Sequence, residues 1–123
     1  MTQGNFRPTH RVDHRVVVTG LGAVTPLGLT AQDSWKNALA GVSGIASITR
    51  FDAAPLDVRI AGEVKQFNAD NYIEKKEQKK MDLFIQYGIA ATRMALEMSQ
   101  LTPYQIEKAN TGTLIGVGMG GLP

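Results

Sequence analysis

The sequence predicts an α/β layered fold that is incomplete. Two apolar, partly β-branched runs, at residues 16–19 and 113–117, border glycines and have the pattern of strands buried on both faces of a parallel sheet. Between them, apolar residues recur at helical spacing over residues 81–98. Strands that alternate with helices are typical of α/β folds, but two core strands form too small a sheet to cover both of its faces. We therefore expect part of an α/β domain.

The composition allows one ordinary domain and excludes several kinds of site. The chain has 123 residues, and its 13 Lys and Arg against 11 Asp and Glu give a net charge of +2, too small to indicate a nucleic-acid or membrane partner. It has no cysteine, so disulfides, thiolate metal sites and a cysteine nucleophile are excluded within this chain. No signal-peptide pattern and no apolar stretch of about 18 residues is present, and we expect a cytoplasmic location.

The first 14 residues are predicted to form a flexible tail. They are polar, contain Gly4 and Pro8, and show neither strand nor helix periodicity. His10 and His14 have the i, i+4 spacing of a helical metal site, but no third ligand is evident and nothing around them favours a helix. We therefore predict no metal site and assign these histidines no role.

Capping residues mark two predicted helices. Thr30 can cap a helix in which Asp33 is the third residue and which should end before Gly41. Thr102 and Gln105, with a proline in the first turn, have the capping-box positions of a second, short helix.

The segments between these helices differ in regularity. Residues 42–71 give mixed signals, and the partial alternation of residues 58–64 fits a hairpin or an irregular excursion. The long helix over residues 81–98 contains small residues, which suggest close packing against another element. Gly88 is expected to permit that approach, because a glycine costs helix stability when it has no such role.

Two glycine clusters resemble cofactor-binding loops, but the residues within and around them do not match the motifs of such sites. Residues 20–25 follow a predicted strand, but Thr25 stands where a dinucleotide fingerprint needs Gly or Ala, and Pro26 interrupts the turn. A tight turn from strand to loop is the better interpretation. Residues 116–121 lack the Lys-Ser or Lys-Thr of a phosphate loop, so their glycines indicate flexibility or close packing. We expect no cofactor.

A basic segment precedes the long helix. In residues 74–80, EKKEQKK, four lysines outnumber two glutamates. Such a run is usually a solvated face, and the alternative is a surface that docks an acidic partner.

Several tracts resemble a known enzyme family. Residues 15–28, RVVVTGLGAVTPLG, and residues 76–88, KEQKKMDLFIQYG, are similar to the opening of the elongating β-ketoacyl acyl-carrier-protein synthases, in particular those of the synthase II type. Residues 62–68 and the terminal GVGMGGL also resemble that family in order and spacing. Residues 15–123 are therefore expected to be the N-terminal part of a β-ketoacyl synthase domain.

The resemblance implies a fold and an activity. The fold is thiolase-like, with two similar βαβαβ halves in a five-layered body that dimerises, and this chain would supply only the beginning of the first half. Similar enzymes load an acyl chain from acyl carrier protein onto a cysteine, decarboxylate malonyl-carrier protein and condense the two units, assisted by two histidines and an oxyanion hole. Because this chain has no cysteine, we expect no catalytic residue in it and no activity of the chain alone.

Two features of that family carry over residue by residue. Lys76, Lys79 and Lys80 match basic positions with which similar enzymes meet the acidic recognition helix of acyl carrier protein. Met119 falls where the family has an apolar residue, commonly Ile, that lines and gates the acyl pocket; Met is longer and more flexible, which leaves the chain-length preference open.

Two alternatives to the synthase itself are a non-catalytic fragment that binds acyl carrier protein and a ketosynthase-like subunit without the cysteine. Made alone, the piece is expected to aggregate or to be partly ordered, because its apolar helix faces would be uncovered.

Overall fold

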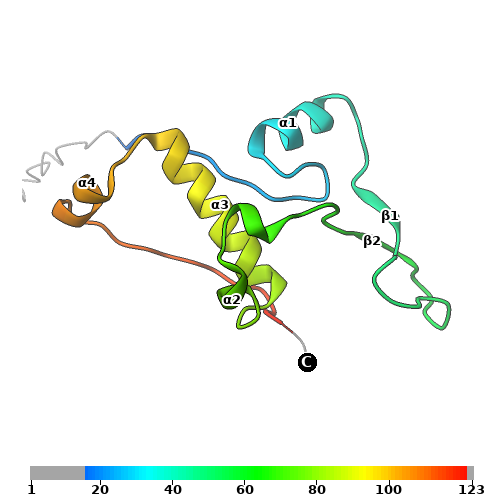
Figure 1. The fold of residues 1–123 in the computed structure, drawn as a ribbon. Helices are drawn as coiled ribbons and strands as arrows, with labels where there is room; N and C mark the ends of the chain where they lie inside the picture. The colour runs from blue at the N-terminus through cyan, green and yellow to red at the C-terminus, as the bar shows by residue number, and fades with distance from the viewer. Residues whose placement is uncertain (1–15, 122–123) are drawn as a thin grey trace, which may run out of the picture.

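The longest helix, α3 (Leu83–Ser99), forms the centre of the molecule (Figure 1). The computed structural model describes residues 16–121. Segments from both ends of the described chain lie against α3, and a two-stranded excursion extends away from it (Figure 1). The other elements, in chain order, are α1 (Ala31–Leu39), β1 (Ile45–Ser47), β2 (Ile60–Gly62), the 3-10 helix η1 (Ala69–Asn71), α2 (Lys75–Gln78) and α4 (Pro103–Lys108).

The capping predictions for α1 and α4 are confirmed. At the start of α1, the hydroxyl of Thr30 accepts a hydrogen bond from the backbone N–H of Asp33 (3.0 Å). At the start of α4, the hydroxyl of Thr102 accepts from the N–H of Gln105 (3.2 Å), and the N–H of Thr102 donates to the side chain of Gln105 (2.9 Å). These bonds satisfy N–H groups that the start of a helix leaves without partners, so both helices begin where their caps predict.

The excursion is a short antiparallel pair of strands. β1 pairs with β2 so that Ala46 lies opposite Ala61, which agrees with the hairpin interpretation of residues 58–64. Beyond the strands, the carboxylate of Glu63 accepts from the hydroxyl (2.7 Å) and the N–H (3.0 Å) of Thr49. These two hydrogen bonds stabilise the charged form and lower the pKa of Glu63.

An arginine ties this excursion to α3. Nη2 of Arg50 donates to the hydroxyl of Tyr87 on α3 (2.9 Å) and to the carbonyl of Val64 (3.2 Å). The ring of Tyr87 meets that of Phe67 edge-on, with 4.9 Å between centroids and 87° between planes. The excursion and the chain that follows it are therefore anchored to the helix at the centre of the molecule.

The two predicted core strands are wrong for this structure. Residues 16–19 and 113–117 form no strand, and β1 and β2 make the one sheet found among residues 16–121. Val16 is 92% exposed and Leu114 is 100% exposed. A strand is stabilised by hydrogen bonds to a neighbouring strand, and within the described chain no segment pairs with either run.

Close packing on α3 is confirmed, but it involves other residues than expected. A Cβ atom added to Gly20 would collide with the backbone carbonyl oxygen of Ala95, and one added to Gly22 would collide with that of Ala91. The chain before α1 therefore lies directly on the backbone of α3, where no side chain fits. Gly88 takes no part in this close packing, because among the described residues no atom outside its own helix lies within 4 Å of a Cβ built there.

Few apolar side chains are buried in the described part of the chain. Ala53, Ile73 and Ala90 are buried, whereas Trp35 and Leu39 on α1 are largely exposed. The expectation of uncovered apolar helix faces is thus confirmed. Within residues 16–121, no helix combines the length and apolar character that a membrane span requires.

Candidate functional site

The three lysines singled out by the sequence lie just before α3. Lys76 is on α2, Lys79 is the C-cap of α2, and Lys80 follows it. The side chains of Lys76 and Lys80 are 74% and 67% exposed, and Lys79 is exposed as well. We call these three residues the lysine cluster.

Two members of the lysine cluster are paired with glutamates of the same segment. Nζ of Lys76 lies 3.1 Å from Oε2 of Glu74, and Nζ of Lys80 lies 2.9 Å from Oε1 of Glu77. No carboxylate of residues 16–121 lies within 4.0 Å of Nζ of Lys79. Exposed ion pairs of this kind contribute little to stability and are weakened by salt, so a partner's carboxylates can replace them.

Side-chain amides hold the segment around α2. Nε2 of Gln78 donates to the carbonyl of Ile73 (2.7 Å) and to Oδ1 of Asp70 (2.9 Å). Nε2 of Gln86, on α3, donates to the carbonyls of Met81 (3.0 Å) and Gln78 (3.3 Å). The hydrogen bond from Gln78 is the main cause of the lowered pKa of Asp70. Sequence reasoning assigned neither glutamine a role.

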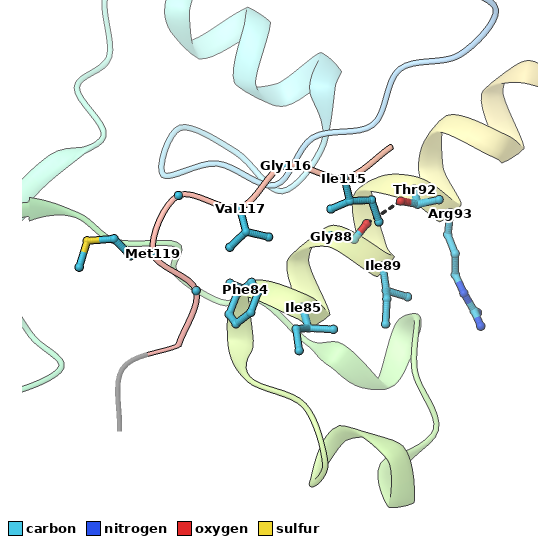
Figure 2. A pocket seen from close by; sticks show the side chains of 12 residues that line it. Phe84, Ile85, Gly88, Ile89, Thr92, Arg93, Ile115, Gly116, Val117 and Met119 are labelled. Carbon is cyan, nitrogen blue, oxygen red and sulfur yellow. Dashed lines mark hydrogen bonds between the residues drawn. The ribbon is translucent and has the colours of Figure 1, made fainter. Parts of the chain in front are cut away.

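An apolar groove lies between α3 and the last described segment. It has a volume of about 770 Å³ and is lined by one face of α3 and by residues 115–120 (Figure 2). Ile85, Ile89 and Val117 are among its apolar side chains. The hydroxyl of Thr92 donates to the carbonyl of Gly88 (2.8 Å), so the helix itself satisfies this polar group. The groove suits an aliphatic chain better than a polar ligand.

The predicted acyl-pocket residue Met119 lies at one end of this groove. Met119 is 79% exposed, and its side chain points away from Phe84 (Figure 2). The next residue, Gly120, has a φ of +72°, and a Cβ built there would lie 3.6 Å from the Phe84 ring. The chain therefore turns beside the start of α3, and this turn places Met119 at the edge of the groove. Lys80 lies a few residues before the start of α3.

The described residues hold no candidate metal site. Within residues 16–121, no group of three His, Cys, Asp or Glu side chains is arranged to hold a metal ion. The predicted tail, with His10 and His14, lies outside the described residues. The site consists of an exposed basic surface and an apolar groove, which can bind and orient a partner or a chain.

Residues 13–122 match the family model described as "Beta-ketoacyl synthase, N-terminal domain", so the chain belongs to the β-ketoacyl synthase family. It is 52% identical over 108 residues to "3-oxoacyl-[acyl-carrier-protein] synthase 2" of Vibrio cholerae serotype O1, and 46% identical over 108 residues to the protein of that name from Staphylococcus aureus strain COL. Each comparison covers 88% of this chain and 26% of the relative. The chain thus spans about a quarter of the length of these curated relatives.

A solved ketosynthase structure shows the same fold. The structure described as "The ishigamide ketosynthase/chain length factor" is 32% identical, with a TM-score of 0.66 over 72% of this chain and 22% of that chain. The family match and this neighbour confirm the resemblance to the β-ketoacyl synthases and the thiolase-like α/β fold, of which this chain carries a part.

Proposed function

We propose that the protein carrying this segment condenses an acyl thioester with malonyl-acyl carrier protein and gives a β-ketoacyl-acyl carrier protein two carbons longer. The observation that carries the proposal is the match of residues 13–122 to the family, with 46% to 52% identity to relatives named synthase 2. The proposal concerns the whole protein, because the chain spans 26% of those relatives. We propose that the whole protein acts as a homodimer.

In this proposal the chain contributes to binding, and the nucleophile lies elsewhere in the protein. Condensation through a covalent acyl intermediate needs a thiolate, and hydrogen-bond donors must stabilise the oxyanion. The chain has no cysteine, so it supplies no nucleophile of this kind and is expected to be inactive alone. The cytoplasmic location stays a prediction.

The lysine cluster supports docking of acyl carrier protein. Its ammonium groups are exposed, and its two ion pairs join neighbours in the sequence rather than distant elements. An acidic helix that approaches can replace Glu74 and Glu77 without unfolding the segment. Complementary charge of this kind speeds encounter and fixes orientation more than it adds affinity.

The groove supports a role for Met119 in the acyl pocket. Phe84, which lines the groove, lies four residues after Lys80, so this end of the groove is close in the chain to the lysine cluster. Met119 lies at the same end (Figure 2). Its flexible, apolar side chain is suited to a variable contact with the acyl chain.

Assay of the complete protein tests the proposed reaction. With acyl- and malonyl-loaded carrier protein, we expect mass spectrometry to detect a β-ketoacyl product two carbons longer. The pure 123-residue chain should give none under the same conditions, since it has no thiol. Product from the isolated chain would overturn the claim of inactivity, and no product from the complete protein would overturn the proposed reaction.

Met119→Trp in the complete protein should narrow the range of acyl chains. A bulky ring at the end of the groove should lower kcat/KM for long acyl substrates about tenfold relative to short ones, because steric exclusion of a few methylenes has about this effect. Met119→Ile should leave the profile close to that of the parent and serves as the control. An unchanged profile in Met119→Trp would remove this residue from the acyl pocket.

A non-catalytic ketosynthase-like subunit is the second candidate. It is favoured by the solved neighbour, whose description pairs a ketosynthase with a chain length factor. The identity to that structure is 32%, against 52% to the synthase 2 of Vibrio cholerae, so the catalytic synthase is the better-supported function. The residue at the nucleophile position of the complete protein separates the two, because the synthase requires cysteine there.

A further inference from the structure

The segment that bears the lysine cluster has little stability of its own. α2 contains four residues, none of them buried, and the side chain of its N-cap, Glu74, makes no capping hydrogen bond. An isolated helix of this length is unstable in water, because few hydrogen bonds compensate for the entropy lost on ordering it. Contacts from outside the segment must therefore keep the three lysines in one arrangement.

Two glutamine amides make these contacts, one on each side of α2. Each amide nitrogen carries two hydrogens, and each uses both. On the N-terminal side, Gln78 reaches back to the carbonyl of Ile73 (2.7 Å) and to Asp70 (2.9 Å). On the C-terminal side, Gln86 reaches from α3 to the carbonyls of Met81 (3.0 Å) and Gln78 (3.3 Å). The segment is thus joined to η1 at one end and to α3 at the other.

The contact made by Gln86 is the harder one to replace. Gln86 is 8% exposed, so water has little access to substitute for its amide. One acceptor, the carbonyl of Gln78, ends α2 and also accepts from the N–H of Met81 (3.2 Å), and the other, the carbonyl of Met81, lies in the turn that follows α2. Among the described residues, the carbonyl of Met81 receives no other hydrogen bond. Without Gln86 this acceptor loses its partner. The turn that carries Lys79 and Lys80 then loses its hydrogen bonds to α3 and keeps local backbone bonds, from the N–H of Lys80 to Glu77 (3.0 Å) and from the N–H of Met81 to Gln78 (3.2 Å).

We infer that Gln78 and Gln86 are positioning residues for the docking of acyl carrier protein: their amides fix the turn that presents the lysine cluster. The inference rests on the proposed docking function of that cluster. Three flexible lysines on a loose segment would bind an acidic helix more weakly, since their ordering would then oppose binding.

The test uses the complete protein with two kinds of substrate. Gln86→Met keeps the length of the side chain and removes the amide, Gln78→Met does the same at a less buried position, and Gln32→Met on the exposed face of α1 is the matched control. The KM for acyl-carrier protein is compared with the kinetics of acyl- and malonyl-pantetheine thioesters, which carry no protein. We expect Gln86→Met to raise the carrier-protein KM about fivefold and Gln78→Met about threefold, with pantetheine kinetics and Gln32→Met unchanged.

The outcomes separate positioning from general stability. Equal losses with both kinds of substrate would assign the glutamines a general role in the fold and overturn the inference, as would an unchanged carrier-protein KM in both variants. If Gln86→Met does not fold, Gln78→Met decides the question. Reversal of the lysine charges in the same assay tests the docking function itself. An effect of the lysines without an effect of the glutamines contradicts only the positioning role, whereas no effect of the lysines contradicts the proposed docking.

Discussion

Replacing Lys76, Lys79 and Lys80 together by glutamate should raise the KM for acyl-carrier protein about tenfold or more at low salt. Each exposed pair with a partner carboxylate contributes up to about 1 kcal/mol, and reversal of the charge adds repulsion to the loss of attraction. Turnover of acyl- and malonyl-pantetheine thioesters by the complete protein should be unchanged, because these substrates offer no acidic surface.

Salt and a charge-matched variant control this prediction. Screening should reduce the difference between the parent and the triple variant as ionic strength rises, because the charges involved are exposed. Reversal of Lys36, Lys65 and Lys108, which are also exposed but lie outside residues 74–80, changes the net charge equally and should have a much smaller effect. Equal effects of the two triple variants would show that net charge, rather than the lysine cluster, governs the KM.

The two intramolecular ion pairs reduce the expected rise in the KM for acyl-carrier protein. Lys76 and Lys80 already interact with Glu74 and Glu77, so the proposed docking would exchange one carboxylate for another instead of pairing a free ammonium group. The net gain at these two lysines is therefore smaller than at Lys79, which has no carboxylate partner among residues 16–121. A weak, salt-sensitive contact also suits a carrier protein that must leave after each transfer.

The helices could be predicted from the sequence because their stabilising contacts are local. Thr30 and Thr102 each cap a helix whose N–H donor lies three residues away, so the interaction is visible in a four-residue window. The apolar spacing over residues 81–98 likewise predicts α3, which spans Leu83–Ser99. Its boundaries differ from the prediction by one or two residues, as helix ends commonly do.

The strands and the close approach could not be predicted in the same way because they depend on distant segments. Residues 16–19 have a strand-like composition, but composition does not supply the neighbour that a ladder needs. The sequence predicts close packing at Gly88, within α3 itself. The glycines that pack against α3 are Gly20 and Gly22, over 60 residues earlier in the chain. A glycine's partner is fixed by the topology of the fold.

In the candidate site, too, some features could be predicted from the sequence and others could not. The positions of the lysines follow from the motif, but their pairing with Glu74 and Glu77 depends on side-chain rotamers that the sequence does not specify. The role of Gln86 was missed, although a signal exists: this polar residue lies one helical turn before Ala90, on the buried side of α3. A polar side chain on a buried helix face needs hydrogen-bond partners, and here they are carbonyls around the lysine cluster.

Gly22→Val should strongly destabilise the complete protein. The Cβ of any side chain at this position would overlap the carbonyl oxygen of Ala91, and a backbone atom in the middle of α3 cannot move aside as a flexible side chain can. Residue 22 lies outside the positive-φ region, so the penalty comes from the lack of space and not from backbone strain. We expect the free energy of unfolding to fall by about 3 kcal/mol, which is in the upper part of the range for overpacking. The measurement is the denaturation midpoint, which should be lower in the variant.

Gly112→Val is the matched control, because a Cβ built at Gly112 meets nothing within 4 Å in the described chain. The same substitution there should lower the midpoint much less. If the two variants denatured at the same midpoint, the chain before α1 would not lie on α3 as it does here. A selective effect of Gly22→Val would show that this contact holds α3 in place, and with it the groove and the turn that presents the lysines.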